Sequence, residues 1–235
     1  GFSCSNCFSL PSRVYSSRRR PGKSYAGFMA KLQRHSSRLL ELVTGSLRRK
    51  VIELAGDNWK IHGHLAFGVD GSKSDATRTL ANRETLKIGG KRKSGPQQLL
   101  VAILHVGTGL LWSFKRDLAT GSERGLLLAQ LDLLPLGVLL LADAGFVGYE
   151  VITRILSSGR PVLMRAGANV QLLEKLGYHV DERHGLVYIW PDQFKNCEPL
   201  VLRRMVFVDG RNRQMCLLTS ILDPRELALE AALAL

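Results

Sequence analysis

The order of β-like and helical segments constrains the fold of this chain more than any other feature. Three short β-like runs follow one another at residues 64–70, 98–106 and 109–114, and a Gly-Thr-Gly turn separates the last two. Helical stretches at 122–134 and 148–157 then alternate with β-like runs at 137–142 and 161–165. Strands joined by short turns pair antiparallel, whereas strands joined through a helix pair parallel, so the order predicts a mixed sheet.

Further β-like runs follow at residues 186–190, 200–208 and 215–219, before a helical tail that starts at Asp223. We therefore predict an α/β fold: a ribonuclease H-like mixed sheet flanked by helices, with a basic N-terminal helical region and a β-rich insertion. The predicted division places a basic arm and helical DNA-binding region in residues 1–55 and the sheet domain in residues 56–235.

The charge of the chain points to a polyanionic partner. Its 33 Lys and Arg residues against 20 Asp and Glu residues give a net charge of +13. Neutralising phosphates releases condensed counterions, so DNA is the first partner to consider. A charge that serves only solubility, or an anionic membrane surface, is the alternative. The residues expected to contact DNA lie in the N-terminal arm and in the basic connection at 82–95: Arg18, Arg19, Arg20, Lys23, Lys91, Arg92 and Lys93.

Cysteine use and hydropathy favour a cytoplasmic protein. The lone C-x-x-C of Cys4 and Cys7 has no second ligand pair at zinc-finger spacing, so free thiols in a reducing compartment are expected. The most apolar run, residues 133–142, is ten residues long, which is too short to span a bilayer. We expect no membrane partner.

Two aspartates end apolar runs and are the candidate catalytic and metal-binding residues. Asp70 closes the first predicted strand and Asp143 the fourth. These strands are neighbours in a ribonuclease H-like sheet, so the two carboxylates should lie side by side. Like charges repel unless a cation lies between them, and Mg²⁺ or Mn²⁺ with two carboxylates suits phosphodiester cleavage. Either aspartate taken alone is more simply a helix cap or a turn residue.

Other polar and aromatic residues have less specific interpretations. We interpret His62, His64 and His105 as structural, and Trp112, Trp190 and Phe194 as core residues rather than base-stacking residues. Arg165 ends the strand after Asp143, and together with Lys73 and Arg78 it could contact phosphates or belong to a solvated basic face; both readings stay open.

The segments FGVDGSKSD, LADAGFVGYE and LLTSILDPREL resemble the DDE transposases of the insertion-sequence-four type, from about residue 25 to the last residue. On that resemblance Asp70 and Asp143 match the first two metal-binding carboxylates. The family's third acid stands in a pattern of Tyr, Arg three positions on, Glu four after that and Lys seven later. Glu226 and Glu230 have no Tyr or Arg at those offsets, so we expect the chain to stop before the third carboxylate.

The resemblance implies a transposase that nicks DNA hydrolytically and then transfers the strand. It also implies transposon ends and target DNA as partners, a homodimer in a synaptic complex, and a bacterial, nucleoid-associated location. One alternative is a catalytically dead DNA-binding remnant of a degenerate mobile element. Another is a nuclease unrelated to transposition, with a third acid such as Asp75 or Asp209.

Overall fold

The computed structural model describes residues 24–86, 95–167, 173–174, 177–191, 195–208 and 210–235. The chain divides into two units, residues up to Leu47 and residues from Arg48 to Leu235, and each is described by itself. The long helix α1, Tyr25–Ala55, contributes to both. It is one continuous basic helix, and its residues Val51 and Ala55 are buried within the second unit.

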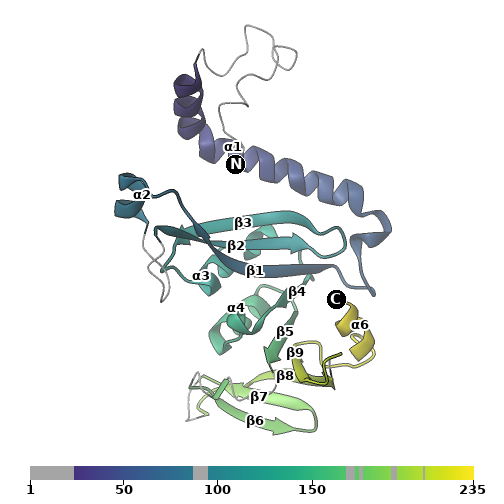
Figure 1. The fold of residues 1–235 in the computed structure, drawn as a ribbon. Coiled ribbons are helices and arrows are strands. Elements are labelled where there is room, and N and C mark those ends of the chain that lie inside the picture. The colour runs from purple at the N-terminus through teal and green to yellow at the C-terminus, as the bar shows by residue number, and fades with distance from the viewer. Residues whose placement is uncertain (1–23, 87–94, 168–172, 175–176, 192–194, 209) are drawn as a thin grey trace. The chain divides into compact units, whose positions relative to one another are not determined.

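One mixed sheet organises the second unit, and within the described residues it has nine strands in the order β3-β2-β1-β4-β5-β9-β8-β7-β6 (Figure 1). β1 pairs with β4 in parallel, and β4 with β5 in parallel, whereas every other pairing is antiparallel. The predicted α/β class and mixed sheet are thus confirmed. The strands are β1 Ala66–Asp75, β2 Gln97–His105, β3 Leu110–Leu118, β4 Leu139–Ala142, β5 Val162–Gly167, β6 His179–Arg183, β7 Leu186–Trp190, β8 Leu200–Val208 and β9 Gln214–Thr219.

Short helices lie between several of these strands and after the last one. Among the described residues, the α-helices of the second unit beyond α1 are α2 Leu80–Thr85, α3 Glu123–Leu128, α4 Tyr149–Ser157 and α6 Leu229–Ala234, and the 3-10 helices are η3 Gly56–Trp59, η4 Leu131–Leu133 and η5 Ala144–Phe146. No helix among the described residues is both long enough and apolar enough to cross a bilayer.

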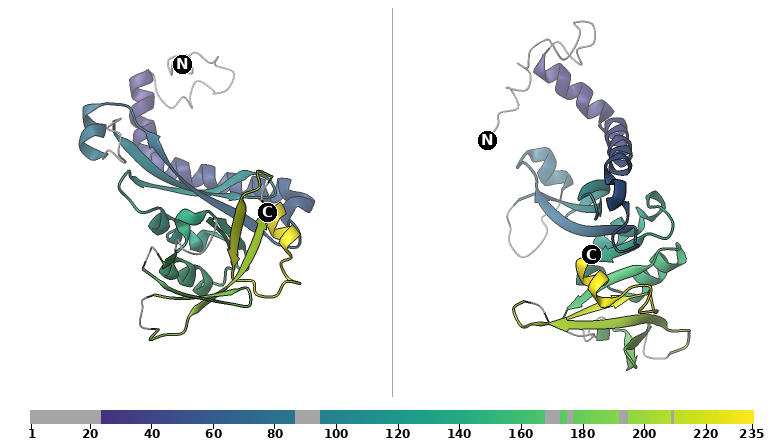
Figure 2. Two further views of the ribbon diagram at one scale, coloured as in Figure 1. Left: turned by 60° about the horizontal axis from the view of Figure 1, so that its bottom comes forward. Right: turned by 90° about the vertical axis from the view of Figure 1, so that its right-hand side faces the viewer.

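Two apolar cores lie on opposite faces of the sheet, because side chains alternate along each strand. The face that buries Phe67, Val69 and Leu140 together with residues of α3 and α4 is called the first face. The second face buries Leu139 and Leu163 with residues from the C-terminal segment around α6, whose position beside the strands is visible in Figure 2.

The predicted helix at residues 122–134 is shorter in the structure. Ser122 caps its start, its hydroxyl accepting from the Gly125 N–H at 3.1 Å, but α3 ends at Leu128. The buried Gln130 amide donates to the Val101 carbonyl of β2 at 3.2 Å and accepts from the Ser113 hydroxyl of β3 at 2.7 Å. Pro135 further disfavours helical geometry at the residue before it. The helix therefore ends early because Gln130 bonds to the sheet and Pro135 follows, and the second half of the expected helix contains the short 3-10 helix Leu131–Leu133 instead.

Candidate active site

Asp70 lies midway along β1 and points away from the first core. Phe67 and Val69 are buried on the first face, so the alternation along the strand puts Asp70 on the second face, where it is exposed. Its backbone pairs with Ala102 of β2. The strand continues to Asp75, beyond the buried part of the sheet.

Asp143 is the residue directly after β4, and it occupies the matching position. β1 and β4 pair in parallel with Gly68 opposite Leu141, so continuing this register by two residues puts Asp70 opposite Asp143. Asp143 is extended (φ −81°, ψ 178°) and follows Leu141 by two residues, which places it on the second face as well. Adjacent strands lie about 4.8 Å apart. The two carboxylates therefore share one face at the same level of neighbouring strands, with Asp70 midway along β1 and Asp143 just past the end of β4.

A network of hydrogen bonds fixes the turn after Asp143. The Asp143 Oδ1 atom accepts from the Gly145 N–H at 2.9 Å and caps η5. Arg124, at the start of α3, donates from Nε to the Gly145 carbonyl at 3.0 Å and from Nη2 to the Val147 carbonyl at 2.7 Å. The turn is thus held by the Asp143 side chain, which bonds to the Gly145 N–H, and by the Arg124 side chain, which bonds to the Gly145 and Val147 carbonyls. Asp143 therefore has the capping role that is the simpler interpretation of a single aspartate, and this role uses only Oδ1, so Oδ2 can bind other partners.

Glu123 brings a third carboxyl group close to β1 but on the other face. A Cβ atom at Gly71 would lie 2.8 Å from the Glu123 Cδ atom, so the side chain of Glu123 packs directly against the strand beside Asp70. Gly71 follows Val69 by two residues and faces the first core, whereas Asp70 faces away from it. Within the described ranges no three His, Cys, Asp or Glu side chains come together as a metal-ligand set.

The other acids considered from the sequence do not join the pair. Asp75 lies five residues beyond Asp70 in the extended strand, roughly 17 Å away, and accepts from Gln97 Nε2 at 2.8 Å. Glu226 precedes α6, and Glu230 lies in the first turn of that helix. Asp209 lies outside the described residues.

The donor set of Asp70 and Asp143 fits a hydrated Mg²⁺ or Mn²⁺ ion. Mg²⁺ in phosphoryl-transfer sites is commonly bound through one or two carboxylates, with waters and substrate phosphates completing its coordination. Both side chains are exposed, so water and a phosphate group can approach them.

The structural interpretation of the histidine and tryptophan candidates is confirmed for His105 and Trp112. His105 is buried between the Thr108 hydroxyl (3.0 Å from Nδ1) and the Trp59 carbonyl (3.2 Å from Nε2). Trp112 is buried and donates to the Leu133 carbonyl at 2.8 Å. Trp190 is half-buried, with Nε1 donating to the Cys197 carbonyl, and Phe194 lies outside the described residues.

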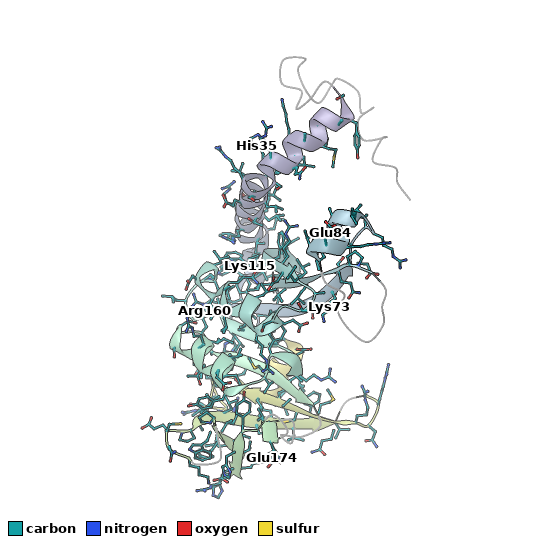
Figure 3. The ribbon with its side chains drawn as sticks, turned by 90° about the vertical axis from the view of Figure 1, so that its left-hand side faces the viewer. His35, Lys73, Glu84, Lys115, Arg160 and Glu174 are labelled. Atoms are coloured by element: carbon teal, nitrogen blue, oxygen red, sulfur yellow. The ribbon has the colours of Figure 1, made fainter. Side chains whose placement is uncertain are left out.

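The residues predicted to contact DNA lie outside the part of the chain that the structure describes: Arg18, Arg19, Arg20, Lys23, Lys91, Arg92 and Lys93. The same holds for Cys4 and Cys7. Exposed cations that are described include Lys73 on β1 and Lys115 on β3, both labelled in Figure 3.

Comparisons with known proteins give a distant structural likeness. No protein-family model matches the chain, and no curated protein matches it. Among solved structures the chain is similar to a piggyBac transposase, seen by cryo-electron microscopy in a synaptic complex with hairpin DNA, at 10% identity and a TM-score of 0.44. The likeness covers 98% of this chain and 50% of that one, so the chain spans about half the length of the protein it matches.

Proposed function

We propose that this chain is a DNA transposase of the DDE type, which uses Asp70 and Asp143 in metal-dependent phosphodiester cleavage and strand transfer. The observation that carries the proposal is the register of β1 and β4, which puts both carboxylates on one face at the same level of two neighbouring strands. Two exposed like charges in that arrangement favour a bound cation.

The strand order supports a ribonuclease H-like interpretation of the sheet. Three antiparallel strands are followed by two parallel ones in the spatial order β3-β2-β1-β4-β5, and α3 and α4 pack on one face. The sequence predicted the antiparallel strands, the later parallel ones and the adjacency of the first and fourth strands. The insertion-sequence-four type, the homodimeric synaptic complex and the nucleoid-associated location are finer parts of the same proposal and rest on the resemblance of the sequence segments.

Asp70 and Asp143 would hold Mg²⁺ or Mn²⁺ in this proposal. When bound, such an ion activates the attacking oxygen and stabilises the leaving oxygen of a phosphodiester. The protein's own contribution is positional: the Gly145 N–H orients one carboxylate oxygen of Asp143, and Arg124 fixes the carbonyls of the turn that carries it. The partner that fits the net charge of +13 is DNA.

The test combines metal binding with DNA nicking by the full chain. Mn²⁺ binding is followed by electron paramagnetic resonance, and nicking by conversion of supercoiled plasmid to open circles. Asp70→Asn and Asp143→Asn should each weaken Mn²⁺ binding and abolish nicking, and both should leave the thermal midpoint near that of the parent chain. Asp132→Asn, an exposed aspartate in η4, is the matched control. Mn²⁺ binding that is unchanged in both variants would contradict the proposal.

A second candidate is a DNA-binding remnant without catalytic activity, and the net charge of +13 is the observation that favours it. It predicts salt-sensitive DNA binding that Mn²⁺ and the two aspartate substitutions leave unchanged. A parent chain that binds the plasmid but neither binds Mn²⁺ nor nicks DNA would establish this candidate in place of the first.

A further inference from the structure

A third charged residue extends the row of Asp70 and Asp143 onto the next strand. β5 pairs with β4 in parallel, with Ala142 opposite Met164, so one further step in register puts Asp143 opposite Arg165. The three residues therefore stand at the same level of three neighbouring parallel strands.

Arg165 also lies on the same face as the two aspartates. Met164 and Ala166 are buried in the first core, whereas Leu163 belongs to the second, so Arg165 between them faces the second side of the sheet. Its side chain is exposed. Adjacent strands are about 4.8 Å apart, which puts the backbone of Arg165 within one strand spacing of Asp143.

The guanidinium of Arg165 retains most of its hydrogen-bonding capacity. Within the described part of the chain its partner is the Met215 sulfur, at 3.8 Å from Nη2, and thioether sulfur is a weak acceptor. Met215 lies on β9, on the side of β5 opposite to β4, and beyond the residue of β9 that pairs with Gly167. This contact therefore turns the guanidinium towards the carboxyl end of β5 and towards β9, so contact with a phosphate at Asp143 requires the side chain to turn back across β5. No ion pair joins Arg165 to Asp143 among the described residues, so the side chain is not consumed in neutralising its neighbour.

We propose that Arg165 binds the DNA phosphate that is brought to Asp70 and Asp143, so that the row forms a phosphodiester-binding site with two carboxylates at one end and a guanidinium at the other. The inference rests on the proposed function. The sequence left open whether Arg165 contacts phosphate or belongs to a solvated basic face, and the inference chooses phosphate contact. A phosphate beside two carboxylates needs cationic partners. Arginine suits the role because it stays charged and its planar fork can donate two hydrogen bonds to one phosphate.

The role is specific to phosphate seated at the carboxylate pair, and it therefore depends on metal. Without a cation the two aspartates repel the phosphate from that position, and Arg165 has little to bind there. With a cation present the phosphate is held next to the guanidinium. A solvated basic face would instead attract DNA equally with and without metal.

The experiment measures binding of a fluorescein-labelled DNA duplex to the full chain by anisotropy, in Mn²⁺ and in EDTA. Arg165→Gln should weaken binding about tenfold in Mn²⁺, the loss expected for one charge-assisted hydrogen-bonding partner, and by less than about twofold in EDTA. Arg165→Lys should recover part of the affinity, since it keeps the charge but not the fork. Arg154→Gln is the matched control, because Arg154 is exposed on α4, a helix that packs on the first face.

Mn²⁺ binding in the absence of DNA separates this inference from the function on which it rests. Arg165→Gln should leave that binding unchanged, whereas Asp70→Asn should weaken it. If Asp70→Asn weakens Mn²⁺ binding and Arg165→Gln leaves DNA affinity unaltered, the inference alone is overturned. An equal loss of affinity in Mn²⁺ and EDTA also overturns it, because it assigns Arg165 to general electrostatics. A parent chain that does not bind Mn²⁺ overturns both.

Discussion

Asp143 has a local structural role and a position beside Asp70, and the two can be separated experimentally. Its Oδ1 atom accepts from the Gly145 N–H, which is a cap that asparagine can also make through its side-chain oxygen. Substitution by asparagine therefore removes the charge and keeps the cap, whereas alanine would remove both. For this reason an effect of Asp143→Asn on metal binding reports the carboxylate rather than the turn.

Gly107 is required by a close approach of two backbone segments near the buried His105. A Cβ atom at Gly107 would lie 1.9 Å from the Asn58 carbonyl oxygen and 3.1 Å from the His105 Cε1 atom. Because backbone has to move to admit it, Gly107→Ala should lower the free energy of unfolding by about 1–3 kcal/mol, measured from urea denaturation. The control is Gly210→Ala, where no atom lies within 4 Å of the added Cβ. Equal denaturation midpoints for the two variants would show that the backbone near Asn58 moves to admit the methyl group without loss of stability.

At the scale of elements, the central strands were predictable from the sequence because each contains an unbroken run of apolar residues. The runs in β2, β4 and β5 illustrate this. β6 was not predicted, because its sequence His-Val-Asp-Glu-Arg has a single apolar residue; the local signal for its pairing with β7 is the two-residue turn His184-Gly185, in which both residues have positive φ. α2 was also missed, since it begins at Leu80 inside a polar connection, with Thr79 as its cap, and buries no residue.

The candidate site was predictable to a similar degree. The ribonuclease H-like interpretation of the segment order predicted that the strands of Asp70 and Asp143 are neighbours, and the pairing of β1 with β4 confirms this adjacency. The hydrogen bonds from Arg124 to the turn after Asp143 were not predictable, because their acceptors are backbone carbonyls, which every residue has. The position of Arg165 depended on the register of β4 with β5, which hydrophobic patterning does not fix to the residue.

In the hairpin of β6 and β7 one carboxylate, that of Asp181, is hydrogen-bonded to two cations and a histidine. Asp181 accepts from Lys195 Nζ at 2.9 Å, from Arg183 Nη2 at 3.0 Å and from His179 Nε2 at 3.3 Å. The hydrogen bond from Lys195 is the largest of the effects that lower the pKa of Asp181. A carboxyl whose pKa is lower in the folded state adds stability above its unfolded pKa, and this contribution disappears as the pH falls through the folded value.

Asp181→Asn should therefore lower the thermal midpoint near neutral pH, and the difference from the parent chain should shrink as the pH falls below the ordinary carboxyl range, about 4. Thermal unfolding followed by circular dichroism at several pH values measures both effects. Asp132→Asn, in the exposed turn η4, should show no comparable change at any pH. A difference for Asp181→Asn that stays constant down to the lowest pH would rule out ionisation as its source.

The whole chain carries a large excess of positive charge, and the ion pairs given for the described residues involve only some of its Lys and Arg side chains. Those pairs that join a Lys or Arg to an Asp or Glu use Lys50, Arg183, Lys195, Arg204 and Arg225. The chain has 33 Lys and Arg residues in all. A surplus of this size is an electrostatic property of the molecule rather than of one site, and it acts through released counterions.

DNA affinity should accordingly fall steeply as salt is added. A chain that neutralises roughly six to ten phosphates loses about a thousandfold or more between about 50 and 200 mM salt. If the N-terminal arm makes such contacts, replacing Arg18, Arg19, Arg20 and Lys23 together by Gln should reduce the slope of log affinity against log salt by up to about four units. Anisotropy titrations of a labelled duplex at several KCl concentrations give this slope. The four-residue variant should retain any Mn²⁺ binding of the parent chain, because Asp70 and Asp143 lie in the sheet and not in the arm. A slope that the substitution leaves unchanged would assign the phosphate contacts to other cations, and the exposed Lys73 and Lys115 on β1 and β3 would be the next to replace.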